Sequence, residues 1–102
     1  MCNIEYSDIA NNDMRELFYF IAREKGMLIT AQRYLQGLKD LIEYIAKNPT
    51  ICPIKYSRSL LEYGFNVRRA NYKKMAIIYT FVEGKNTIYI HRVIAASMIT
   101  GI

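Results

Sequence analysis

The sequence predicts an α+β fold in which an N-terminal strand and a two-helix antiparallel hairpin precede a three-stranded antiparallel sheet. Two observations support this prediction. Apolar residues recur at helical spacing in the first half of the chain, and they form runs typical of strands in the second half. With 102 residues, of which 52% are apolar, the chain is long enough for one core and too short for two. We therefore expect a single domain over residues 1–102.

The first strand is predicted over residues 2–6, where apolar and polar side chains alternate. Ser7 and Asp8 then favour the start of a helix, because a serine can cap the helix and an early negative charge suits its first turn. Apolar side chains at helical spacing continue this helix until Lys25 and Gly26, which are typical of a helix end.

A second helix is expected from an N-cap at Thr30 to a stop at Asn48 and Pro49. Only a few residues separate it from the first helix, so the two should lie antiparallel. Their apolar stripes need a further surface to cover them.

That surface is predicted from three strands in the second half of the chain. Residues 50–59, which include Pro53, indicate an irregular connection before them. The turn at residues 83–86 contains Gly84, which predicts an antiparallel hairpin of the last two strands. The apolar run 75–82 suits a central strand, and the helices should cover one face of the sheet while the other face or the rim stays free for partners. The three strands are predicted at residues 65–69, 75–82 and 87–93.

The formal net charge is +5, and one segment carries the excess. Residues 8–47 hold equal numbers of basic and acidic side chains, whereas residues 55–74 hold one acid, Glu62, against six cations. Clustered cations attract polyanions or acidic protein surfaces. We therefore expect a negatively charged partner, the alternative being a solvated face that keeps a small protein soluble. The expected partner-binding cations are Lys55, Arg58, Arg68, Arg69, Lys73 and Lys74, together with Arg92 further along the chain.

The sequence lacks the residue combinations that most enzyme reactions require. His91 is the single histidine, so a histidine-activated nucleophile has one possible base and a histidine metal cluster has no second ligand. Nucleotide, zinc and calcium motifs are missing, and we predict neither a cofactor nor a metal. Cys2 and Cys52 lack CxxC spacing and are assigned no chemistry.

A basic and aromatic constellation remains as the candidate for chemistry. RNA cleavage by the 2′-hydroxyl requires a base, an acid and cations around the scissile phosphate. The residues alone leave open whether His91 and Tyr72 are functional or structural. The candidate catalytic residues are Arg68, Arg69, Tyr72, Lys73 and His91.

The sequence also predicts a cytoplasmic protein without a membrane partner. Its longest apolar run, residues 75–82, is far shorter than the ~20 residues that a bilayer requires. The first residues lack a basic stretch followed by an apolar core, so nothing resembles a secretory signal.

Short words in the sequence carry a family resemblance over nearly the whole chain. They are YSDIA (6–10), DMREL (13–17), YFIA (19–22), AKNP (46–49), GFNVRR (64–69), NYK (71–73), IIY (77–79) and IHRVI (90–94). In their order and spacing they resemble the RelE/ParE superfamily of bacterial type II toxins. The resemblance implies a RelE/ParE-like fold and the role of a toxin in a type II toxin-antitoxin system.

Within the superfamily, the long hairpin with its YFIA word is similar to the ParE branch. That similarity implies growth inhibition by binding DNA gyrase and trapping cleaved DNA, which is a binding activity more than an enzymatic one. The alternative is a RelE-like, ribosome-dependent mRNA endonuclease. The resemblance also implies a cognate antitoxin that silences the toxin, and a toxin-antitoxin hetero-oligomer. An acidic antitoxin helix or strand would cover apolar grooves beside the hairpin and neutralise the cationic segment.

Two departures from the family pattern bear on activity. Met75 and Ala76 stand where relatives have Tyr-Arg, and the apolar stretch 95–99 stands where many have His or Tyr followed by Arg. The loss of these polar groups weakens the nuclease interpretation. It also leaves open an attenuated, non-toxic family member that acts as a binding module. We expect packing on the core, rather than in a partner interface, for Ile94, Met98, Ile99 and Ile102.

Overall fold

The computed structural model describes residues 1–99, and its elements follow the predicted order. The strands are β1 (Asn3–Tyr6), β2 (Val67–Tyr72), β3 (Met75–Val82) and β4 (Thr87–Ala95). The α-helices are α1 (Asp8–Tyr19) and α2 (Leu28–Lys47). A π-helix, η1 (Phe20–Glu24), continues α1. Three 3₁₀ segments complete the chain: η2 (Arg58–Tyr63), η3 (Glu83–Lys85) and η4 (Ala96–Met98).

The strands form one sheet in the order β1-β4-β3-β2. β3 pairs antiparallel with β2 and with β4, so the predicted hairpin and the central place of residues 75–82 are confirmed. The N-terminal strand β1 lies parallel to β4, with Asn3 opposite Thr87 and Tyr6 opposite Ile90. The α+β fold class is therefore confirmed, and the sheet has a fourth strand taken from the start of the chain.

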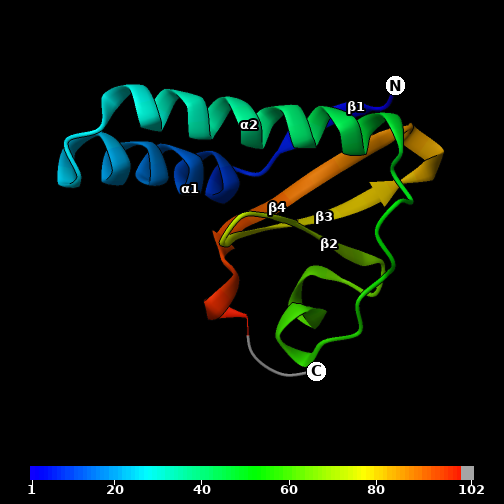
Figure 1. The fold of residues 1–102 in the computed structure, drawn as a ribbon. Coiled ribbons are helices and arrows are strands. Elements are labelled where there is room, and N and C mark those ends of the chain that lie inside the picture. The colour runs from blue at the N-terminus through cyan, green and yellow to red at the C-terminus, as the bar shows by residue number, and fades with distance from the viewer. Residues whose placement is uncertain (100–102) are drawn as a thin grey trace.

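The helical hairpin covers one face of the sheet (Figure 1). Residues of α1 and α2 form one buried cluster with β3 and β4. Burial at these positions agrees with the apolar spacing of the sequence, because each helix turns its apolar stripe toward the strands. The largest buried side chains of this cluster are Leu38, Ile42, Ile45, Ile77, Tyr79, Ile88 and Ile90.

The second face of the sheet is partly covered as well, which corrects the expectation that it stays free. Leu60 of η2 is buried with Val67, Ala76 and Ile78 in a smaller cluster. Ile99 packs against that cluster, as expected for the apolar tail.

Other parts of the tail differ in their packing. Met98 is 65% exposed, so its predicted packing is wrong, whereas Ile94 is half-buried. Ile102 lies outside the described residues.

Several boundaries differ from the sequence predictions. The first helix was expected to run to Lys25 and Gly26, but α1 ends at Tyr19 and the π-helix η1 follows it, and β4 runs on to Ala95. α2 begins at Leu28, after Met27 as N-cap, so Thr30 lies inside its first turn and is not the cap. β2 begins at Val67 and runs to Tyr72, later than predicted, since Phe65 and Asn66 form a bend before it. The irregular segment before β2 gains order from η2 and from a bridge between Ile54 and Arg68.

A bulge in β4 is hydrogen-bonded to Ser7, the residue between β1 and α1. Ile78 pairs with Arg92 while Tyr79 pairs with Ile90, which leaves His91 as the extra residue. The carbonyl oxygen of His91 accepts a hydrogen bond from Ser7 Oγ at 2.7 Å. Ser7 Oγ in turn accepts the Ala10 backbone N–H at 2.9 Å, so the predicted N-cap of α1 is confirmed.

No helix within residues 1–99 is both long and apolar enough to cross a bilayer. The same residues contain no group of three or more His, Cys, Asp or Glu side chains placed to hold a metal ion. Cys2 and Cys52 are both free thiols.

Candidate functional site

The edge strand β2 separates two of the candidate arginines. Successive side chains of a strand point to opposite faces of the sheet. Arg68 lies on the helix side, where its guanidinium donates to the backbone carbonyl of Cys52. Arg69 lies on the η2 side, and its Nε donates to Asn71 Oδ1 at 3.0 Å. The adjacent arginines therefore do not act on one ligand from the same face.

A cavity of about 420 Å³ on the η2 side brings Arg69 together with Lys55. The backbone N–H of Lys55 donates to the Val67 carbonyl at 2.8 Å, which fixes this segment beside β2. Ile54, Leu60 and Ile99 supply apolar walls. Arg58 begins η2 and is exposed, but it does not line this cavity.

Tyr72 and Lys73 occupy the other end of β2, where they take part in packing against α2. The Tyr72 ring meets Tyr34 edge-on, with ring centroids 5.1 Å apart. Lys73, at a positive φ of 53°, holds its Nζ 5.3 Å from the Tyr34 ring centroid. Burial raises the pKa of Tyr34 above its usual value. Lys74 is exposed in the same turn, and neither of these two lysines lines the cavity that Lys55 and Arg69 share.

His91 sits in an aromatic and hydroxyl environment on the η2 side. Its Nε2 lies 2.7 Å from Thr80 Oγ1, and its ring is 5.2 Å from that of Tyr63 and 4.9 Å from that of Tyr89. Burial lowers the pKa of His91 below 6.5. Burial therefore favours the neutral form of the imidazole.

Arg92 forms an ion pair across the molecule with Asp13 of α1. Its Nε and one terminal nitrogen reach the carboxylate oxygens at 2.8 and 3.0 Å, and the Val93 N–H donates to the same carboxylate at 3.0 Å. The hydrogen bonds to Asp13 raise the pKa of Arg92. Arg92 thus has a structural partner and ties α1 to the bulge in β4.

The structure therefore divides the predicted cationic set. Lys55 and Arg69 share a cavity, and His91 lies on the same face of the sheet. Lys73 and Lys74 lie in the turn between β2 and β3, outside the cavity, and Arg68 faces the helices. Periodicity along a strand could have separated Arg68 from Arg69. The bulge that aims His91 and Arg92 could not be seen in the sequence.

One surface feature was missed by the sequence analysis. At the turn of the helical hairpin, large apolar side chains are exposed to solvent, and we call this cluster the hairpin tip. A signal was available, because Met27, Leu28 and Ile29 follow the turn at Gly26 as an unbroken apolar run. The hairpin tip consists of Tyr19, Phe20, Met27, Leu28 and Ile29, with exposures of 45%, 51%, 50%, 54% and 64%.

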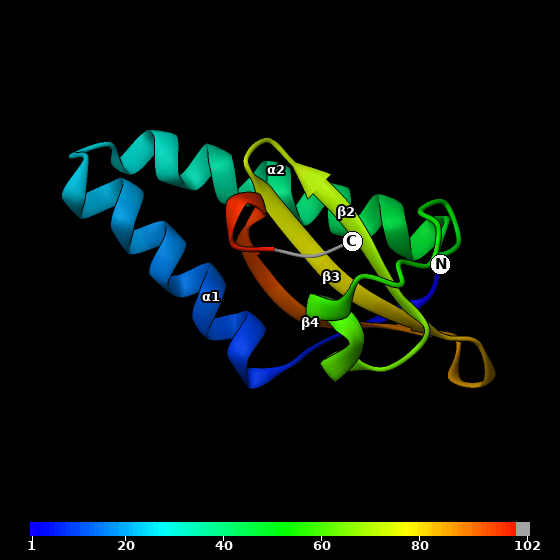
Figure 2. The same cartoon turned by 90° about the horizontal axis from the view of Figure 1, so that it is seen from below.

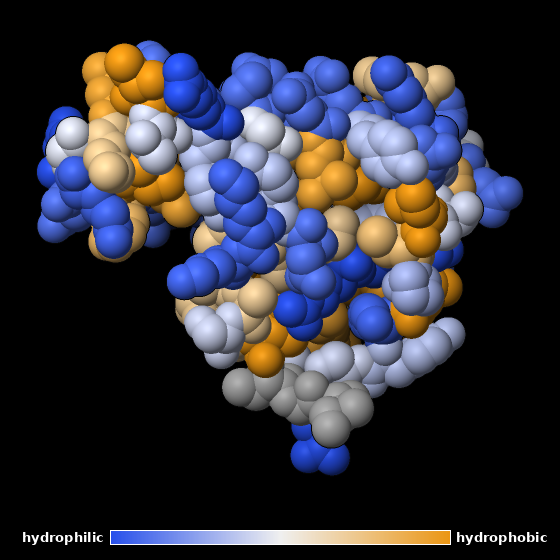
Figure 3. Space-filling view, viewed as in Figure 1, coloured by the Kyte–Doolittle hydropathy of each residue, from blue (hydrophilic) through white to orange (hydrophobic). Residues whose placement is uncertain are grey.

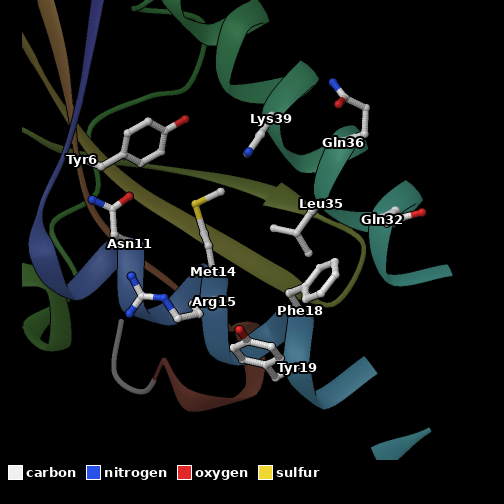
Figure 4. Close-up of a pocket in the computed structure, with 10 residues that line it drawn as sticks. All are labelled: Tyr6, Asn11, Met14, Arg15, Phe18, Tyr19, Gln32, Leu35, Gln36 and Lys39. Atoms are coloured by element: carbon white, nitrogen blue, oxygen red, sulfur yellow. The ribbon is translucent and has the colours of Figure 1, made fainter. Parts of the chain in front are cut away.

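A groove of about 700 Å³ runs between α1 and α2. Figure 4 shows Met14 and Phe18 of α1 and Leu35 of α2 between the two helices. Arg15 and Lys39 are the charged side chains among its described lining residues, and none of the lining residues is acidic. The groove therefore combines apolar walls with a positive rim.

The sequence matches a family model along almost its entire length. The model describes the ParE toxin of type II toxin-antitoxin systems, parDE, and it matches residues 4–100. No curated protein matches the chain.

Several solved structures share the fold. The chromosomal ParDE toxin-antitoxin system of P. aeruginosa contains a chain with a TM-score of 0.70 and 14% identity, over 93% of this chain and 96% of that one. The intact RelBE toxin-antitoxin complex of E. coli gives 0.62 and 16%, over 94% and 98%. A metal-bound toxin from Helicobacter pylori gives 0.61 and 18%, over 98% and 100%. At these identities the likeness establishes the fold alone.

Proposed function

The chain belongs to the family of ParE toxins of type II toxin-antitoxin systems, and we propose that it inhibits growth by binding DNA gyrase. The observation that carries this proposal is the ParE family match over residues 4–100. Trapping an enzyme on its substrate is an act of binding, so it requires a docking surface and no catalytic centre.

The placement of the candidate catalytic residues supports binding over cleavage. General acid-base cleavage needs its proton donor, proton acceptor and cations within hydrogen-bond reach of one phosphate. Here Arg68 and Arg69 face opposite sides of the sheet, and Lys73 is held over the Tyr34 ring. The family resemblance implies His or Tyr followed by Arg after the last strand, where this chain has Ala95-Ala96-Ser97-Met98-Ile99.

Two measurements test the gyrase proposal. Induced expression without an antitoxin should arrest growth and induce the DNA-damage response. The purified protein should inhibit supercoiling by gyrase and accumulate cleaved DNA. Supercoiling that continues unchanged at a large molar excess of the protein would refute the proposal.

The alternative function, ribosome-dependent mRNA cleavage, draws on one specific arrangement. Lys55 and Arg69 share a cavity on the face of the sheet that also carries the imidazole of His91. Primer extension on translated messages tests it. Cuts at fixed codon positions that disappear in an Arg69→Ala variant would favour this alternative, and their absence would exclude it.

A cognate antitoxin is the second partner that we propose, and the groove between α1 and α2 is its suggested contact. Its apolar walls and the cations Arg15 and Lys39 fit an acidic amphipathic segment. The product of a neighbouring reading frame should copurify with this chain. Charge reversal of both cations, Arg15→Glu with Lys39→Glu, should weaken that complex, whereas charge reversal of the exposed Lys85 of η3 should not. Equal affinity in all variants would exclude the groove as the contact.

A further inference from the structure

We infer that the hairpin tip is the surface with which this protein docks on gyrase, and that it fits an apolar protein pocket bordered by acidic side chains. The inference rests on the proposed function and adds the site of contact to it. The groove suggested for the antitoxin lies along the hairpin, and Tyr19 is the one residue that it shares with the hairpin tip.

The hairpin tip leaves large apolar side chains exposed to solvent, and this exposure contributes nothing to the stability of the fold. Tyr19 and Phe20 close α1, and Leu28 and Ile29 open α2, yet each is between 45% and 64% exposed. Solvent-facing turns are usually polar, and contiguous exposed apolar residues mark interaction sites. Figure 3 shows this apolar surface at the upper left, at the end of the hairpin.

No other part of the described chain is placed to cover the hairpin tip. Figures 1 and 2 show the turn of the hairpin projecting past the ends of the strands. η1 contacts mainly the two helices that it joins. The helices therefore carry the apolar cluster away from the core and present it to solvent.

Two features of the hairpin tip make its helices less stable than other sequences would. Met27 occupies the N-cap of α2 and makes no side-chain capping bond, and the first turn of α2 holds no acid. A Ser, Asp or Asn at an N-cap usually contributes ~1 kcal/mol. A π-helix also replaces regular α-helix at Phe20–Glu24, and such segments are rare and occur frequently at functional sites. Both features are consistent with a surface shaped for contact.

Charge at the hairpin tip indicates the chemistry of the occupant. The guanidinium of Arg23 lies 4.7 Å from the Tyr19 ring centroid, and Lys25 Nζ lies 5.6 Å from that of Phe20. Residues 15–33 contain four cations and two acids, so this end of the hairpin is positive. Aromatic residues beside arginine are typical of the few contacts that dominate protein interfaces. An apolar pocket with carboxylates at its border would complement both the rings and the cations.

The experiment compares substitutions at the hairpin tip with matched substitutions elsewhere on the same helices. The variants are Phe20→Ser and Ile29→Ser, and the controls are Ile9→Ser on α1 and Tyr44→Ser on α2. Ile9 and Tyr44 are 56% and 49% exposed, so all four changes remove exposed apolar surface. Thermal unfolding of each purified variant checks that the fold is retained, and light scattering gives the oligomeric state.

Inhibition of gyrase supercoiling is the readout. The hairpin-tip variants should require at least about tenfold more protein for half-inhibition, as loss of a central interface contact predicts. The controls should act as the unchanged protein does. Equal potency of the hairpin-tip variants, or an equal loss in the controls, would overturn the inference and leave the gyrase proposal standing.

Two other outcomes would also overturn the inference. If the unchanged protein is a dimer, the hairpin-tip variants are monomers and inhibition is unaffected, then the occupant is a second copy of this chain. If the unchanged protein has no effect on gyrase, the proposed function fails and the inference fails with it.

Discussion

Gly37 of α2 lies against the side chain of Tyr72 at the end of β2. A Cβ added at Gly37 would lie 2.0 Å from Tyr72 Oη and 2.7 Å from Tyr72 Cζ. The Tyr72 ring is held in place by the edge-on contact with Tyr34 and by the Lys73 ammonium, 5.5 Å from its centroid. The ring therefore has little freedom to move away from an added methyl group.

We predict that Gly37→Ala lowers the free energy of unfolding by about 1 kcal/mol. The helix propensity of alanine favours the variant, but the displacement of Tyr72 outweighs that gain. Urea denaturation checks the prediction. In a Tyr72→Leu background the same change should become stabilising, because the clashing ring atoms are gone. A more stable Gly37→Ala single variant would show that Tyr72 moves freely.

A second residue, His91, makes the free energy of unfolding depend on pH. Burial lowers its pKa in the folded state below 6.5. Between the folded and unfolded pKa values the unfolded chain binds more protons, so the free energy of unfolding rises with pH across that window. Stability is therefore lost as the pH falls below 6.5 and the imidazole must become charged beside Thr80, Tyr63 and Tyr89.

We predict that His91→Gln reduces this pH dependence. Glutamine keeps a hydrogen-bonding group toward Thr80 and does not titrate. The urea midpoint of the unchanged protein should fall between about pH 7.5 and about pH 5.5 by more than that of the variant. Parallel losses in both proteins would mean that His91 contributes nothing to the acid sensitivity.

At the scale of elements, the two helices show how much local sequence reveals. The start of α1 and the end of α2 could be predicted because Ser7 and the Asn48-Pro49 stop are local signals. The start of α2 could not be predicted. Its N-cap is Met27, whereas Thr30 has the hydroxyl group that is usual in a capping residue. The exposed hairpin tip and this unusual cap share one cause, which is an apolar run at a solvent-facing turn.

The two candidate caps give a paired prediction. Ser7→Ala should cost about 1–2 kcal/mol of unfolding free energy, because the hydroxyl caps α1 at Ala10 and also donates to the His91 carbonyl. Thr30→Ala should change stability by less than about 0.5 kcal/mol, since Thr30 is an exposed residue within the first turn of α2. Thermal or urea unfolding measures both. A larger cost at Thr30 than at Ser7 would contradict the observed caps.

At the scale of the whole molecule, the candidate site was less predictable than the fold. The strands β3 and β4 were visible as apolar runs, and their hairpin followed from the turn at residues 83–86. The parallel pairing of β1 with β4 joins residues far apart in the chain, so no local pattern reports it. The cations Lys55 and Arg69 meet only because of the bridge between Ile54 and Arg68.

We predict that a fragment of residues 1–82, which lacks β4, does not fold cooperatively. β4 lies between β1 and β3 and contributes Ile88, Ile90 and Val93 to the main core. Without it β1 has no partner strand and the apolar stripes of both helices lose much of their cover. Circular dichroism during urea titration should show a gradual loss of helix. A sharp transition like that of the full chain would refute the prediction.

The parallel pairing of β1 with β4 also has a consequence for synthesis on the ribosome. The nascent chain makes its helices early, but β4, the strand that completes their core, is translated after β1, β2 and β3. Until then the sheet does not cover the apolar faces of the hairpin, and β1 has no partner strand. The hydrogen bond from Ser7 to His91, beside this strand pair, joins residues that are 84 positions apart in the sequence. Native structure is therefore reached only after β4 has been translated, so products of a message interrupted before β4 cannot act as the folded toxin does.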